Sequence, residues 1–118
     1  MHIAAIVLQV ILALMFLMAT FSKFRDKRQV EAFEHYGYPQ WFRIVTGIVE
    51  LIGAIGMVVG IWYPAVAPLA GLWLGITMLV AAITHIRVKD PAKSLLFPVI
   101  LLVLNVLVVL LQWNALVG

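Results

Sequence analysis

Four long apolar segments constrain this chain more than any other feature. They cover residues 3–22, 42–62, 64–86 and 91–113. Each is close to the roughly 20 residues that a helix needs to cross a bilayer. Hydrophobic residues make up 65% of the chain and charged residues 11%, whereas soluble domains are about half apolar and a quarter charged. We therefore predict an integral membrane protein that forms a single transmembrane domain over residues 1–118.

The basic residues are distributed asymmetrically along the chain. All eight lie in or beside the first and third connections between the apolar segments: Lys23, Arg25, Lys27, Arg28, Arg43, Arg87, Lys89 and Lys93. Such residues mark the cytoplasmic side of a membrane protein. Four spans then leave both termini outside. The basic residues form no extended stripe with interleaved aromatics, so nucleic acid is not predicted as a partner.

The first connection contains signals for a helix of its own. Asp26, with Gln29 three residues later, resembles a capping box, and Gly37 is typical of a helix end. We predict a short amphipathic helix over residues 27–36, lying in the membrane interface. The predicted fold is all-α: an antiparallel bundle of four transmembrane helices, with this interfacial helix between the first two.

Proline and glycine suggest further details of the bundle. Asp90 followed by Pro91 is a favourable start for the fourth span, with Asp90 as N-cap, and Pro98 is expected to kink that span. The pairs Gly56-xxx-Gly60 and Gly71-xxx-Gly75 allow close approach of helices. Packing within one chain is the favoured interpretation of these glycines, and a homodimer interface is the alternative.

Five polar side chains are predicted to converge on the cytoplasmic third of the bundle. They come from three spans and form the candidate ligand-binding set: Lys23, Thr46, Glu50, Thr84 and His85. Glu50 is the only acidic residue within the spans, where charge is costly and commonly functional. The alternative is a structural role, with Glu50 neutral or paired with Lys23, His85 or Arg43.

Other residue patterns narrow the chemistry. Gln9, Thr77 and Asn105 form a second, deeper set, best interpreted as hydrogen bonds between helices. His35 and Tyr36 are expected to be solvated at the interface. The sequence has no cysteine, no metal-ligand motif and no Gly-rich phosphate loop, HExxH or GxSxG motif. It therefore assigns no metal site and no catalytic residue, and it leaves open whether the protein is an enzyme.

Several short motifs resemble those of the DoxX-like family of small bacterial membrane proteins. They are Lys23 at the end of the first span, Gly37-Tyr38-Pro39, Glu50-xx-Gly53, and Thr84-His85. The resemblance extends over residues 3–111. It implies a bacterial inner-membrane protein related to chains associated with quinone and thiol redox chemistry, among them a subunit of thiosulfate:quinone oxidoreductase. The lack of cysteine argues against direct thiol chemistry here.

Three hypotheses for function follow. The leading one is a protein that binds a quinone or another lipophilic small molecule, or serves as an accessory subunit of a membrane redox system. The second is a proton-coupled exporter, because small multidrug resistance proteins also have four spans and one essential glutamate. That glutamate lies in their first span, whereas this first span contains no acidic residue, and its polar residues include Gln9, Thr20 and the terminal Lys23. The third is a structural scaffold without a ligand.

Overall fold

The fold is built from helices throughout the part of the chain that the structure, a computed structural model, describes (residues 2–117). In chain order the elements are α1 (His2–Arg25), α2 (Lys27–Tyr36), α3 (Gln40–Trp62), α4 (Val66–Arg87), the 3₁₀ helix η1 (Ala92–Leu95), α5 (Leu96–Leu111) and α6 (Trp113–Val117). Four stretches are long and apolar enough to cross a membrane: α1, α3, α4, and η1 together with α5. The predicted all-α membrane fold with four spanning helices is therefore confirmed.

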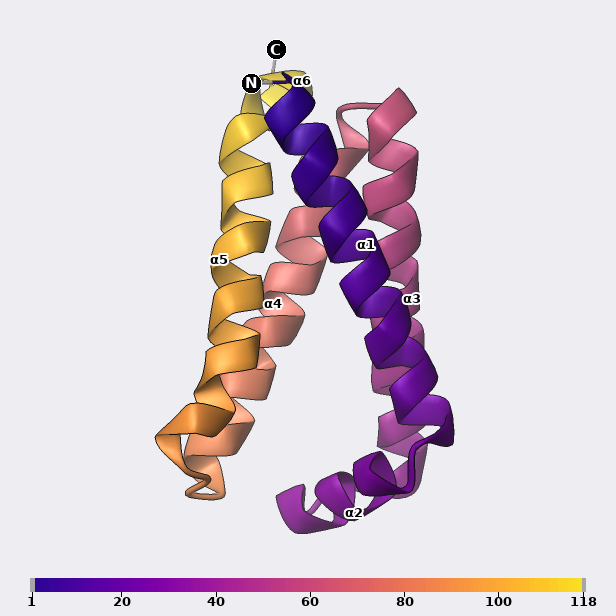
Figure 1. Cartoon of the computed structure of the whole chain (residues 1–118), viewed down its shortest axis with the longest axis vertical. Helices are drawn as coiled ribbons and strands as arrows, with labels where there is room; N and C mark the ends of the chain where they lie inside the picture. The colour runs from indigo at the N-terminus through magenta and orange to yellow at the C-terminus, as the bar shows by residue number, and fades with distance from the viewer. Residues whose placement is uncertain (1, 118) are drawn as a thin grey trace.

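The four long helices form two pairs, which meet at one end and diverge at the other. The helix α1 packs along α3, and α4 packs along α5. In Figure 1 the pairs approach one another near the two chain ends and separate toward the opposite end, where α2 lies across the opening. The helix α2 contacts both α1 and α3. The wedge shape is what makes room for a cavity above α2.

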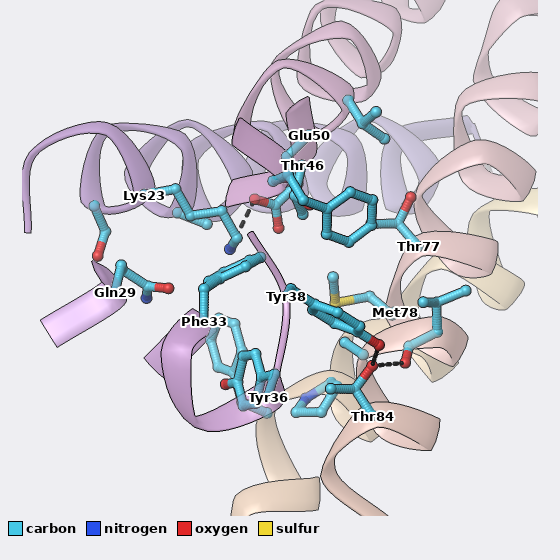
Figure 2. A pocket seen from close by; sticks show the side chains of 18 of the residues that line it. Lys23, Gln29, Phe33, Tyr36, Tyr38, Thr46, Glu50, Thr77, Met78 and Thr84 are labelled. Atoms are coloured by element: carbon cyan, nitrogen blue, oxygen red, sulfur yellow. Dashed lines mark hydrogen bonds and ion pairs between the residues drawn. The ribbon is translucent and has the colours of Figure 1, made fainter. Parts of the chain in front are cut away.

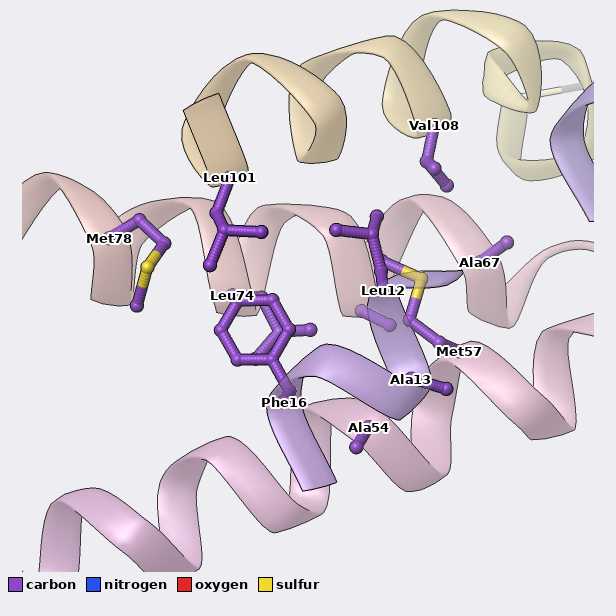
Figure 3. Packing of buried hydrophobic residues seen from close by; sticks show 11 residues of the cluster. Leu12, Ala13, Phe16, Ala54, Met57, Ala67, Leu74, Met78, Leu101 and Val108 are labelled. Carbon is purple, nitrogen blue, oxygen red and sulfur yellow. The ribbon is translucent and has the colours of Figure 1, made fainter. Parts of the chain in front are cut away.

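The apolar core lies where the pairs meet. Its largest fully buried side chains, Phe16, Leu12, Met57, Leu74 and Leu101, are at most 1% exposed, and Figure 3 shows them interdigitating between the helices. The outer faces of the helices are also apolar and remain exposed. A surface of this kind suits acyl chains, because lipid solvates apolar side chains without penalty.

Glycines bring α3, α4 and α5 into close contact. A Cβ at Gly60 would lie 2.9 Å from both Cβ and backbone N of Ala67, and one at Gly71 would lie 2.8 Å from a methyl group of Val109. These glycines therefore pack helices of the same chain, as the favoured interpretation expected.

The helix α2 forms where the local signals placed it. The Asp26 carboxylate caps it by accepting from the backbone N–H of Arg28 at 2.9 Å, and Gly37 ends it with φ +81°. This capping bond comes from the second helical residue, whereas in a capping box it comes from the third. The described hydrogen bonds also do not include the reciprocal bond from Gln29 that a capping box requires. Phe33 is buried toward the bundle.

The fourth spanning segment differs from the expectation. It begins as the 3₁₀ helix η1, and the helix is interrupted at Gln112, before the short α6. Pro98 is the third residue of α5 and was expected to kink the span. At that position its missing N–H falls among the first-turn donors, which have no partner within an α-helix in any case. The change from 3₁₀ to α geometry lies between Leu95 and Leu96, before Pro98, and the kink at Pro98 stays a prediction.

Candidate functional site

A cavity of about 600 Å³ lies between the diverging helix pairs, above α2. It is bordered by α1, α2, α3, α4 and the first residues of α5 (Figure 2). Most of its lining is apolar, contributed by side chains such as Met15, Phe33, Val45, Met78 and Phe97. All five residues of the candidate set also line it: Lys23, Thr46, Glu50, Thr84 and His85.

Lys23 and Glu50 form an ion pair in the wall of the cavity. Lys23 Nζ lies 2.9 Å from Glu50 Oε1, and the side chains are 15% and 2% exposed. Of the three partners considered for Glu50, the structure selects Lys23. Arg43 is engaged elsewhere: its Nε donates to Gln40 Oε1 at 2.8 Å, and its Nη1 donates to the backbone oxygen of Lys23. Arg43 thereby fixes the end of α1 against the start of α3.

The two threonines of the candidate set are bonded to their own helices. Thr46 donates to the backbone oxygen of Phe42 at 2.8 Å, and Thr84 to that of Val80 at 2.9 Å. The Thr84 hydroxyl also lies 2.9 Å from the Tyr38 hydroxyl. Since Thr84 has one hydroxyl proton and gives it to Val80, Tyr38 is the donor in this second bond. Tyr38 is thus tied to α4 across the cavity.

His85 is hydrogen-bonded to Asp90, a residue that the sequence predicted to be the N-cap of the fourth span. The helix α4 ends in a Schellman motif: Asp90 N donates to His85 O at 3.0 Å, Lys89 N donates to Ile86 O at 3.1 Å, and Lys89 adopts φ +60°. This turn folds Asp90 back beside His85, and Asp90 Oδ2 lies 2.6 Å from His85 Nδ1. The expectation that Asp90 caps the fourth span is wrong, since η1 is preceded by Pro91 and has no side-chain cap.

His35 completes a three-residue group with Asp90 and His85. His35 Nε2, from α2, lies 2.7 Å from Asp90 Oδ1. The hydrogen bond with His85 has the largest effect on the pKa of Asp90, followed by the hydrogen bond with His35, and together they hold it below its ordinary value of 3.8. The carboxylate therefore accepts from both rings. His35 is 56% exposed, as expected for an interfacial residue, but it is paired rather than merely solvated.

An aromatic wall borders the cavity where α2 leads into α3. It comprises Phe33, Tyr36, Tyr38 and Phe42, whose neighbouring rings lie 5.0 to 6.4 Å apart between centroids. Tyr36 is partly buried rather than solvated, and its ring meets that of His85 edge-on at 5.5 Å. Sequence reasoning missed these rings as site residues. The available signal was the dense run of aromatics on both sides of Gly37.

Arg87 strengthens the link between this wall and α4. Its guanidinium lies 5.1 Å from the centre of the Tyr38 ring, in cation–π geometry, and it also donates to the backbone oxygen of Tyr36. The aromatic wall is therefore bound to α4 by side chains, whereas α2 packs directly on α1 and α3.

The deeper polar set does not form one cluster. Gln9 Nε2 donates to the backbone oxygen of Met57 at 3.0 Å, which is a tie between helices as expected. Asn105 Nδ2 instead bonds within its own helix, to Leu101 O at 2.7 Å. Thr77 also bonds within its helix, to Trp73 O, and it lines the cavity. Within residues 2–117, no group of three or more His, Asp or Glu side chains is arranged to hold a metal ion.

The fold and the cavity together define a class: a small membrane protein with four spanning helices and, near one end, a largely apolar cavity that contains a few polar side chains. The chain belongs to the DoxX-like family, whose model matches residues 7–108. It is similar to the uncharacterized protein YdgD of Bacillus subtilis (strain 168), with 35% identity over 83 residues that cover 70% of this chain and 73% of that protein. No solved structure matches the chain.

Proposed function

We propose that this protein binds a lipophilic small molecule with a polar head, of the quinone type, in the cavity above α2. One observation carries the proposal: the five polar residues singled out from the sequence line a single cavity of about 600 Å³ together with aromatic rings. Ligand sites typically have this volume, with apolar walls and a few polar groups. A closed, filled core would instead have favoured the scaffold hypothesis.

The buried ion pair supports a functional role for the cavity. Removing two charges from water costs several kcal/mol per ion, and the mutual attraction often fails to repay it. A contribution to stability alone therefore does not explain why Lys23 and Glu50 are buried here. Beside a ligand head, the ammonium group can donate to a carbonyl or hydroxyl oxygen, and the carboxylate can accept from a hydroxyl.

The cavity also offers a route for an apolar tail. Some of its lining residues are at the same time exposed on the outer surface: Met18 is 72% exposed on α1, Phe97 52% on α5, and Ile76 62% on α4. Between spanning helices these positions face acyl chains. A head near Lys23 and Glu50 with a tail that leaves between helices is the arrangement expected for a ligand that partitions into lipid.

We further propose an orientation in a bacterial inner membrane, with the cavity near the cytoplasmic side and both termini outside. The basic residues lie at α2 and the connections beside it, where the positive-inside rule places the cytoplasm. A protein that binds a quinone in this position would serve a membrane redox enzyme as an accessory subunit. Alkaline phosphatase fused after Val117 should be active in cells, and green fluorescent protein fused there should be dark; the reverse pattern would refute the orientation.

Ligand-dependent stability tests the proposed function. The purified protein in lipid nanodiscs is titrated with a decyl-substituted benzoquinone, and the melting temperature is followed, because a ligand that binds the folded state raises it by mass action. We expect a saturable rise that Glu50→Gln and Thr84→Val diminish. Gln9→Met removes a buried polar tie outside the cavity and serves as the matched control: it lowers the starting temperature and leaves the rise intact. No rise at saturating quinone, or an equal rise in Glu50→Gln, would refute the proposal.

A further inference from the structure

A chain of two hydrogen bonds connects the cavity to the cytoplasmic end of the molecule. His85 lines the cavity, its Nδ1 is bound to one oxygen of Asp90, and the other oxygen is bound to Nε2 of His35. The side chains of His85 and Asp90 are 18% and 15% exposed, whereas that of His35 is 56% exposed. The group therefore begins at the cavity and ends at the surface.

The hydrogen bonds to Asp90 determine which nitrogen of each ring carries a proton. A carboxylate only accepts hydrogen bonds, so the nitrogens that face Asp90, Nδ1 of His85 and Nε2 of His35, carry protons. In neutral His85 the remaining nitrogen, Nε2, then has a free lone pair. This nitrogen can accept a proton from a ligand, and Asp90 stabilises the imidazolium ring that results, as in other aspartate–histidine pairs.

One carboxylate serves two rings. A single negative charge compensates one imidazolium ion, and a second positive ring on the same carboxylate is repelled by the first. Charging His85 therefore favours loss of a proton from His35. That proton leaves from Nδ1 of His35 into water, while the bonds from both rings to Asp90 persist.

We propose that His85, Asp90 and His35 form a proton-exchange group, so that the ligand of the cavity is one whose polar head carries an ionisable hydroxyl, such as a phenol or a hydroquinone. This inference rests on the proposed function and specifies its ligand. The hydroxyl gives its proton to Nε2 of His85 and remains bound as an oxyanion. In the proposed exchange His35 begins as the imidazolium ion and releases one proton to water, so two protons move and the net result is the release of one proton per ligand. No electron moves, and the reverse sequence restores the starting state.

Other charged and titratable groups surround the exchange group without replacing its members. From α2, the Tyr36 ring packs edge-on against His85. From α4, Arg87 donates to the backbone of Tyr36 and covers the ring of Tyr38. From α1, Lys23 lies in the cavity wall, where it is paired with Glu50. Its ammonium group adds to the stabilisation of an oxyanion in the cavity.

A chromogenic phenol tests the inference. The probe is 2-decyl-4-nitrophenol, which absorbs in the visible only when ionised, and its methyl ether is the control ligand. Both are added to the protein in nanodiscs, in weakly buffered medium below the pH at which the free phenol ionises. Wild-type protein should colour the bound phenol and release about one proton per phenol to the medium. The ether should bind by calorimetry without any proton release.

Variants separate the roles of the three residues. With His85→Gln or Asp90→Asn, the phenol should bind and stay colourless. With His35→Gln, the bound phenol should be coloured, but the proton should stay on His85, so release to the medium falls severalfold. A bound phenol that stays colourless in wild type, or equal proton release from His35→Gln, overturns the inference while the binding function stands. If neither the phenol nor the ether binds, both proposals fail.

Discussion

Breaking the Lys23–Glu50 pair offers a quantitative test of the structure. Glu50 is 2% exposed, so Lys23→Met leaves a carboxylate that water hardly reaches, and loss of one partner of a buried pair costs about 3 to 5 kcal/mol. Lys23 is 15% exposed at the end of α1, so after Glu50→Gln its ammonium can extend toward the interface. We therefore expect about 3 kcal/mol of destabilisation from Lys23→Met and about half of that from Glu50→Gln.

The double variant isolates the interaction itself. Lys23→Met combined with Glu50→Gln removes both charges. The double variant should be destabilised by about 2 kcal/mol less than the sum of the two single destabilisations, a coupling within the range for contacting residues. Unfolding in mixed micelles, followed by circular dichroism, measures all four proteins. The exposed pair of Asp26 and Arg28 is the matched control, with a smaller coupling because solvent screens it. Additive effects within roughly 0.5 kcal/mol would mean that the buried pair does not form.

Three further predictions concern packing, backbone strain and pH. Gly60→Ala should destabilise by about 1 to 3 kcal/mol because the new methyl group meets α4 backbone, whereas Gly75→Ala, with 3.7 Å of room, should be tolerated; chemical unfolding compares them. Lys89→Gly should stabilise by about 1 kcal/mol, because glycine adopts φ +60° without strain, and an unchanged unfolding midpoint would contradict the Schellman geometry. The pKa of Asp90 is lowered in the folded state. The contribution of Asp90 to folding stability is therefore fully present above its ordinary pKa of 3.8, and it is lost as the pH falls through the lower pKa of the folded state. Hydrogen-exchange protection of α2 should fall over that interval in wild type and be low at every pH in Asp90→Asn.

Sequence reasoning succeeded where the signals are local. Apolar runs of membrane length determine the spanning helices, because unpaired backbone groups are excluded from lipid. The helix α2 is likewise marked by residues at its own ends, Asp26 and Gly37. Convergence of Glu50 and Lys23 was also accessible, because the rise per residue places both at a similar depth once the spans are known.

The sequence did not predict the group formed by His85, Asp90 and His35, because this group depends on a turn that lacks its usual sequence signal. A Schellman motif is normally recognised by glycine in the left-handed position, and here Lys89 occupies it. Asp90 followed by Pro91 then resembles a helix start, although the turn directs the carboxylate back to His85. The bond from His35 lies 55 residues away in sequence and depends on where α2 rests. No periodic pattern along one helix reports such a contact.

The position of the cavity follows from where the small residues stop. In the half of α3 and α4 that is distant from α2, Gly53 faces Leu74 and Gly60 faces Ala67, so these helices touch closely. Toward α2 the cavity replaces that contact, from Glu50 on α3 and Ile76 on α4 onward. Because helices are stiff, close contact at one end with bulky side chains at the other holds the pairs apart there, and α2 covers the opening. The buried charges thus lie where the sequence leaves space for a ligand, and not where it packs the helices together.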